Sequence, residues 1–196
     1  LLLQYDPAYK TRFRRLTTKS GLRALAELLP TTDSPLQVHR VSAIRRLAAR
    51  LALTTDHAND VARQIRALAS SRYAPLTQLC GVNLLTAGML AGLLGPGARF
   101  DTDAQLAAYA GVAPREASSG ERVRHRLNRG GNRRLNSIIY RIGVTQARHS
   151  TDAKTYLARR MSQGKTKREA HRTLRRYIVR ELWHLWRECH VGGSAA

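Results

Sequence analysis

Residues 36–70 read LQVHRVSAIRRLAARLALTTDHANDVARQIRALAS, and this stretch decides the architecture of the first half of the chain. Its apolar side chains recur three and four residues apart, at Val41, Ile44, Leu47, Leu51, Ala58, Val61, Ile65 and Leu68. This period predicts an amphipathic helix, either one long helix or two helices joined near residues 54–56. One long helix suits a coiled coil or a strut between domains, whereas two would form an ordinary helical hairpin. Helical linkers of this kind often dimerise, so we expect a homo-oligomer.

The rest of the sequence also favours a mainly α fold. Further helical patterns cover residues 21–29, 84–94, 104–110, 133–149, 150–163 and 166–190. Capping residues mark several of their starts: Ser150 precedes one helix, and Thr166 with Glu169 forms a capping box before the last. We expect a helical linker or coiled coil over 1–72, a compact helical domain over 73–190 and a disordered tail over 191–196. The chain starts without Met and reads as part of a longer protein.

The charge balance excludes a neutral metabolic enzyme and points to a polyanionic partner. The chain has 196 residues, with 34 Lys and Arg against 13 Asp and Glu, and a formal net charge of +21. Hydrophobic residues make up 43%, so this charge belongs to a folded protein rather than a disordered tail. Nucleic acid is the simplest partner. No membrane is expected, and the unpaired Cys80 and Cys189 suit a reducing cytoplasm.

A turn within residues 76–94 resembles a helix-hairpin-helix element. A short helical pattern is followed by Gly81-Val82-Asn83 and then by a second helical pattern. Gly and Asn tolerate the left-handed backbone of such a hairpin, whose amides would bind a phosphate group without reading bases. Gly81 and Asn83 are therefore candidate nucleic-acid contacts. The alternative is a helical turn in an all-α core.

Basic residues are concentrated between residues 115 and 187, where 17 Arg and three Lys face five acidic residues. The segment 121–127 alternates basic and apolar residues and predicts a strand or an extended arm. A Gly-rich turn and a predicted helix start follow it, and arginines beside such a start form a good phosphate cradle. The candidate nucleic-acid contacts here are Arg115, Arg122, Arg124, Arg126, Arg129, Arg133 and Arg134. The alternative is a solvated charged face.

Ser118 and Ser119 precede this cluster and are candidate nucleophiles. Phosphodiester attack by a protein hydroxyl requires cations that neutralise the pentavalent phosphorus, and the arginines would supply them. His125 is the nearest His, but a local His is more often structural than catalytic. The scattered acidic residues and the His spacing provide no metal site within this chain, so none of its residues is assigned as a metal ligand.

The second half of the chain contains a series of short motifs in a specific order. They are Gly81-Val82 with Thr86-Ala87, Arg99-Phe100, LAAYAGVAP at 106–114, Ser118-Ser119-Gly120, RGGNRRL at 129–135, Tyr156 and Gln163-Gly164-Lys165. Over about residues 73–187 this series resembles the C-terminal transposase domain of the insertion sequence one-hundred-ten family, the guide-RNA-directed serine recombinases of bacterial mobile elements. The helices before residue 73 are similar to the coiled-coil linker of that family.

The resemblance implies that Ser119 is the nucleophile that becomes covalently joined to DNA, with Ser118 as its rival. It also implies an N-terminal RuvC-like domain with four acidic metal ligands, which nothing in these 196 residues matches. Mg²⁺ is then expected in the full-length enzyme through that domain, and no cofactor on this part. DNA and a guide RNA are the implied partners, in a bacterial cytoplasm and associated with the nucleoid. This part alone is expected to bind nucleic acid without cutting it.

Two functions therefore remain open from the sequence. The first is the catalytic-serine domain of a DNA transposase that works with RNA guidance. The second is a stand-alone, non-enzymatic DNA- or RNA-binding module. Both predict salt-dependent binding, and replacing the serine would separate them.

Overall fold

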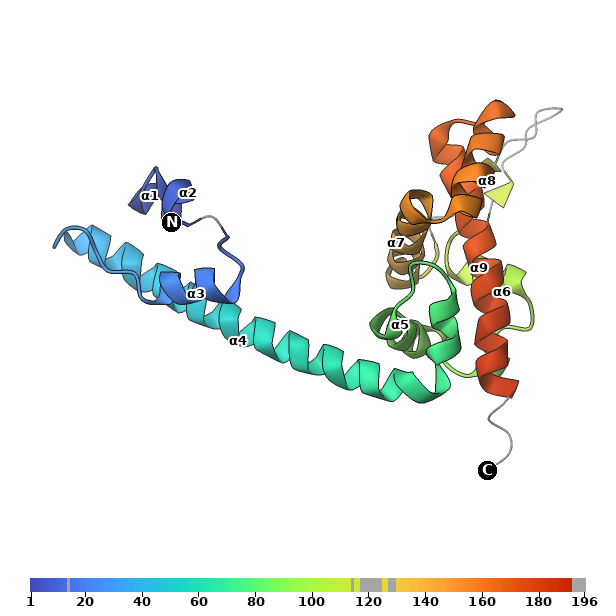
Figure 1. Cartoon of the computed structure of the whole chain (residues 1–196), viewed down its shortest axis with the longest axis horizontal. Helices are drawn as coiled ribbons and strands as arrows, with labels where there is room; N and C mark the ends of the chain where they lie inside the picture. Colours follow the sequence, from blue (N-terminus) through green and yellow to red (C-terminus); the bar gives the residue numbers. More distant parts are fainter. Residues whose placement is uncertain (14, 114, 117–124, 127–129, 192–196) are drawn as a thin grey trace. The chain divides into compact units, whose positions relative to one another are not determined.

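The computed structural model describes residues 1–13, 15–113, 115–116, 125–126 and 130–191. The fold is mainly α, as predicted, and the described strands are two residues long each. The chain divides into two compact units, Leu1–Ala62 and Arg63–Ala196 (Figure 1). Residues 192–196, in the predicted tail, lie outside the described residues. No helix in the described part of the chain is both long and apolar enough to cross a membrane.

The first unit packs three short helices against the first half of a long one. The short helices are α1 (Leu2–Tyr5), α2 (Tyr9–Arg12) and α3 (Lys19–Ala26), and the long helix is α4 (Pro35–Arg72). The buried side chains of this unit are Tyr5, Phe13, Leu22, Leu25, Leu28, Val41, Ile44 and Ala48. They bury one stripe of α4, as the three-and-four spacing of its apolar residues predicts.

Helix α4 is continuous through residues 54–56, so the helical-hairpin interpretation is wrong. The Thr54 hydroxyl donates to the Arg50 carbonyl oxygen at 2.8 Å, and the Thr55 hydroxyl donates to that of Leu51 at 2.7 Å. These bonds to the preceding turn satisfy both polar side chains without interrupting the helix. No Gly or Pro stands in this stretch to break it.

The second unit is organised around its last helix. In chain order it contains η1 (Ala74–Gln78), α5 (Leu84–Leu94), η2 (Gly97–Arg99), α6 (Asp103–Tyr109), β1 (Arg115–Glu116), β2 (His125–Arg126), α7 (Arg133–His149), α8 (Thr151–Ser162) and α9 (Lys167–Val191). Helix α9 packs against α6, α7 and α8 (Figure 1). The core includes Leu106, Ile139 and Trp186, each at most 1% exposed. This packing places the first turns of α9 beside α7, where the candidate site lies.

The predicted helix starts of this unit are confirmed. The Ser150 side chain accepts a hydrogen bond from the Ala153 amide at 3.3 Å at the start of α8. Before α9, the Thr166 amide donates to the Glu169 carboxylate at 2.8 Å and the Glu169 amide donates back to the Thr166 hydroxyl at 3.4 Å. This reciprocal pair is the capping box.

Candidate nucleic-acid interface

Residues 109–111 at the end of α6 contact residues 131–132 directly before α7, and we name these two sets of residues the loop closure. The Asn132 amide donates to the Tyr109 carbonyl oxygen at 2.7 Å, and the Asn132 side chain donates to the Tyr109 hydroxyl at 2.8 Å. A Cβ atom on Gly131 would collide with the backbone of Gly111. Glycine is therefore required at position 131 because the two backbones touch.

Asn136 and Arg99 support the loop closure from either side. The Asn136 side chain donates to the Ala110 carbonyl oxygen at 2.8 Å. The Arg99 guanidinium lies 4.5 Å from the centre of the Tyr109 ring, a cation–π contact. The Asn132 hydrogen bond, followed by contacts with Arg99, lowers the pKa of the Tyr109 phenol below its usual value. The phenol is thus held as a hydrogen-bond acceptor that orients the first residue before α7.

Strands β1 and β2 pair in an antiparallel manner, with Arg115 opposite Arg126. The strand or extended arm predicted over 121–127 is thus confirmed for His125 and Arg126. The pairing also sets Glu116 opposite His125, the described residues that precede and follow segment 117–124. Ser118 and Ser119 belong to that segment and lie outside the described residues, as do Arg122, Arg124 and Arg129.

The start of α7 combines a helix N-terminus with two exposed arginines. The Asn132 side chain caps the helix by accepting from the Leu135 amide at 3.0 Å. Arg133 and Arg134 follow in the first turn, which contains no acidic residue. The positive end of the helix dipole and the two guanidinium groups both favour an anion here. The structure therefore places these two predicted contacts directly after the loop closure.

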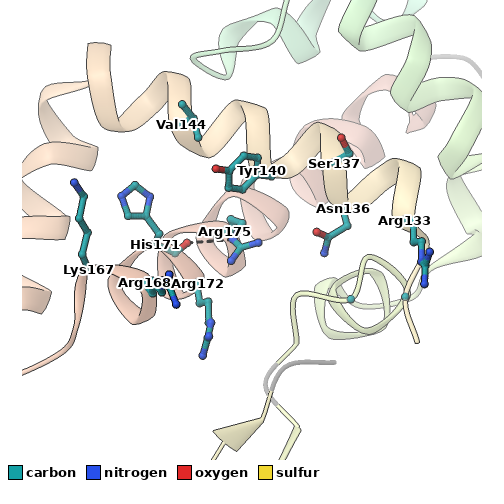
Figure 2. A pocket seen from close by; sticks show the side chains of 12 residues that line it. Arg133, Asn136, Ser137, Tyr140, Val144, Lys167, Arg168, His171, Arg172 and Arg175 are labelled. Atoms are coloured by element: carbon teal, nitrogen blue, oxygen red, sulfur yellow. Dashed lines mark hydrogen bonds between the residues drawn. The ribbon is translucent and has the colours of Figure 1, made fainter. Parts of the chain in front are cut away.

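A basic pocket of about 620 Å³ lies between α7 and α9, and we name it the α7–α9 pocket. Figure 2 shows its side chains projecting from both helices. Its lining residues are Gly111, Gly131, Arg133, Asn136, Ser137, Tyr140, Val144, Lys167, Arg168, His171, Arg172 and Arg175. Gly111 and Gly131 also belong to the loop closure. The pocket therefore borders the loop closure.

The α7–α9 pocket is positively charged. It contains five cationic side chains, and no carboxylate is among its lining residues in the described part of the chain. Two acids on or facing α9 are engaged elsewhere: Asp103 accepts from Arg176 at 2.7 Å, and Glu169 caps α9. Uncompensated cations that converge on a concavity favour an anionic ligand.

Burial sets the protonation behaviour of two residues in the pocket. Burial, reinforced by the nearby Arg172, lowers the pKa of the Arg175 guanidinium, which remains charged. Burial also lowers the pKa of the His171 imidazole, and Lys167 and Arg175 lower it further. His171 is then a neutral hydrogen-bonding group near pH 7, and the charge of the pocket comes from its Arg and Lys residues.

Sequence reasoning missed the α7–α9 pocket. It singled out basic residues only up to Arg134, although Arg168, His171, Arg172 and Arg175 are spaced three and four residues apart on one face of α9. That spacing was the available signal. The partner face on α7, with Asn136 and Tyr140, became visible only with the packing of α7 against α9.

Of the two predicted hairpin contacts, Gly81 lies against α7 and Asn83 lies at the start of α5. Gly81 has a φ of 93°, as predicted for a hairpin glycine, and a Cβ there would approach Thr145 and Ile142 to 3.2–3.3 Å. Asn83 caps α5, because its side chain accepts from the Thr86 amide at 2.9 Å. The segment before them is the 3-10 helix η1. Both residues are exposed, and their phosphate contact stays a prediction.

The described residues do not provide a magnesium site. No group of three or more His, Cys, Asp or Glu side chains within the described ranges is arranged to hold a metal ion. We therefore derive no chemical step through a metal on these residues.

Comparison with known proteins finds two matches. Residues 73–158 match the family model described as the transposase IS116/IS110/IS902 family. Over 145 residues the chain is 32% identical to the insertion element IS110 uncharacterized 43.6 kDa protein of Streptomyces coelicolor. The matched region covers 72% of this chain and 36% of that relative, so the chain spans about a third of the relative's length.

Proposed function

Because residues 73–158 belong to the transposase domain of the IS116/IS110/IS902 family, we propose that the chain is the C-terminal part of a DNA transposase that forms a covalent serine–DNA intermediate. The observation that carries this proposal is the family match over the domain that holds both the serines and the loop closure. The resemblance assigns the nucleophile to Ser119, with Ser118 as the rival. The loop closure supports the assignment, because it joins residues 109–111 to residues 131–132 directly before Arg133 and Arg134, and both serines belong to the stretch of sequence between these two ends.

The proposed reaction conserves the phosphodiester energy. The Ser119 Oγ forms a bond to the phosphorus of a DNA phosphodiester, and the bond from phosphorus to one deoxyribose oxygen breaks. The serine releases its proton, and the departing deoxyribose oxygen gains one. Attack by a DNA hydroxyl group on the serine–phosphate linkage reverses these bond changes and joins the new strands. Arg133 and Arg134 would stabilise the negative charge that develops on the phosphoryl oxygens.

The further partners follow the resemblance and are part of the same proposal. Mg²⁺ is assigned to a RuvC-like acidic domain elsewhere in a longer protein, and a guide RNA accompanies the DNA. Homo-oligomerisation through α4 is supported by Leu47, Leu51, Val61 and Leu68, whose side chains are 44–79% exposed. These residues fall three or four positions apart or at sums of those spacings, as on the seam of a coiled coil.

A search for a protein–DNA adduct on a denaturing gel tests the serine assignment. The longer protein that contains this chain is incubated with labelled target DNA, guide RNA and Mg²⁺. We expect an adduct with wild type and with Ser162→Ala, an exposed serine at the end of α8 that serves as the matched control. Ser119→Ala should abolish the adduct and leave DNA affinity unchanged. Loss only with Ser118→Ala would move the nucleophile by one residue, and DNA binding without an adduct would contradict the serine mechanism.

A stand-alone nucleic-acid-binding module is the second candidate function. The α7–α9 pocket favours it, because its five cationic side chains form an anion site that needs no serine. In that case neither serine substitution would change any measured property beyond a small effect on affinity. The adduct experiment therefore separates the two candidates.

A further inference from the structure

We propose that the α7–α9 pocket receives one unpaired nucleotide of a single strand, with its phosphate on the arginines of α9 and its base against Tyr140. This inference rests on the nucleic-acid binding proposed above and specifies the form of nucleic acid that the pocket takes. It concerns the pocket alone and does not depend on the serine chemistry.

The positive charge of the pocket favours binding of a phosphate group. Arg175 is half-buried, and its neighbours within the described residues include Arg172, Tyr140 and the His171 carbonyl oxygen, to which its Nε donates at 3.3 Å. A guanidinium removed from water without a carboxylate partner is unfavourable until an anion binds. Arg168 and Arg172 present further donors from the same face of α9 (Figure 2). A phosphate would satisfy these forked donors together.

Tyr140 provides a surface for a base. The residue is 56% exposed although it lines the pocket, and the Arg175 guanidinium lies 5.8 Å from the centre of its ring. Aromatic rings and arginine planes are the groups on which single-stranded bases stack. The pocket therefore places a stacking surface and a phosphate site within the reach of one nucleotide.

Asn136 and Ser137 add polar groups beside Tyr140 (Figure 2). The Asn136 side-chain nitrogen is engaged by the Ala110 carbonyl oxygen at 2.8 Å, and this bond orients the amide with its oxygen as an acceptor. An amide oxygen and a hydroxyl group are partners for the edge of a base. They give the pocket the mixed lining that is typical of ligand sites.

The shape of the site favours an unpaired nucleotide over a duplex. A volume of about 620 Å³ lies within the range of roughly 300–1,000 Å³ that small-ligand sites occupy. In a duplex both faces of each base are covered by its neighbours, so Tyr140 could stack only on a base that has left the stack. A single strand exposes such a base at no cost in base pairing.

Binding to strands with and without bases tests this inference on the full 196-residue chain. Fluorescence anisotropy would compare labelled 12-mers of thymidine, of uridine and of abasic deoxyribose phosphate, together with a 12-bp duplex, all at one low salt concentration. The abasic strand matches the thymidine strand in charge and lacks only the bases. We expect thymidine to bind more tightly than the abasic strand by between about fivefold and hundredfold, as expected for one stacked base. The uridine strand distinguishes an RNA ligand from a DNA ligand.

Substitution of Tyr140 localises the effect. Tyr140→Ala should remove most of the preference for bases and change affinity for the abasic strand by less than about twofold, while Tyr140→Phe should retain the preference. The matched control is Tyr177→Ala, since Tyr177 is 47% exposed on α9 and does not line the pocket. Circular dichroism of each variant verifies folding.

Two results would overturn the inference, and they have different meanings. Equal affinity of wild type for thymidine and abasic strands, or a preference that survives Tyr140→Ala, would refute base binding in the pocket and leave the proposed transposase function standing. Failure to bind any of the strands or the duplex at low salt would refute the nucleic-acid function, and the pocket proposal with it.

Discussion

Replacing Gly131 by alanine should destabilise the protein because two backbones meet at the loop closure. An alanine Cβ would collide with the amide nitrogen and Cα of Gly111 and would lie 2.9 Å from the Ala110 carbonyl carbon. These are backbone atoms, which cannot move aside as the end of a flexible side chain does. Overpacking of this kind costs about 1–3 kcal/mol. The two hydrogen bonds from Asn132 to Tyr109 would be strained by the same displacement.

Gly92→Ala provides a control with the opposite expected sign. Gly92 lies within α5, and a Cβ there meets no atom within 4 Å. Alanine relieves the entropic cost of glycine in a helix, so this variant should gain about 0.5–1 kcal/mol. One substitution type is thus expected to lower stability at one position and raise it at the other.

Urea and thermal denaturation followed by circular dichroism would measure both variants. At about 2–4 °C per kcal/mol, Gly131→Ala should lower Tm by about 2–12 °C and Gly92→Ala should raise it slightly. The urea slope m should be unchanged in both, since neither variant alters the surface exposed on unfolding. If Gly131→Ala were as stable as wild type within about 0.5 kcal/mol, the backbone contact between Gly131 and Gly111 would not exist in solution.

Two further predictions concern a helix cap and an ion pair that stabilise the second unit. Asn83→Ala removes the cap of α5 and should lower the free energy of unfolding by about 1 kcal/mol in urea titrations. Asn83→Ser keeps a capping hydroxyl group and should retain most of the wild-type stability. An equal loss of stability in both variants would argue against a capping role. Asp103 accepts a hydrogen bond from Arg176 that lowers the pKa of its carboxyl group below the ordinary value. Its contribution to stability is therefore present above the unfolded pKa and is lost as the pH falls through the folded pKa. In urea titrations, wild type should be more stable than Asp103→Asn at pH 7 and should lose this advantage below about pH 4. A stability difference that does not change with pH would exclude the ion pair as the source of the difference.

Most of the helices could be predicted from the sequence, because their caps and apolar spacing involve residues only a few positions apart. The Ser150 cap and the Thr166–Glu169 capping box involve residues three apart, so both could be read directly from the sequence. At residues 54–56 the sequence left one continuous helix and two joined helices both open, and the structure shows the continuous helix. Thr54 and Thr55 can bond either to a turn or to the preceding helical carbonyl oxygens, and the sequence does not distinguish these outcomes.

The candidate site was predictable only in part. Arg133 and Arg134 were identified because a Gly-rich turn before a helix start is a sequence pattern, and the structure places them beside the loop closure. The proposed phosphate contact of Arg175 could not be predicted, because the partial burial of this residue depends on α7, whose Tyr140 stands 35 positions earlier in the chain. Periodicity shows which face a residue occupies on its own helix and carries no information on the helix that will cover it.

The sequence by itself determined the mainly α class, the capped helices of the second half, the excess of positive charge and the family motifs, because each depends on composition or on residues a few positions apart. The tertiary structure decided that Gly131 touches Gly111 and that α7 and α9 enclose a basic pocket with Tyr140 on its wall. These features depend on contacts between helices distant in sequence. Such contacts follow from the packing of whole apolar faces, and no short stretch of residues encodes them.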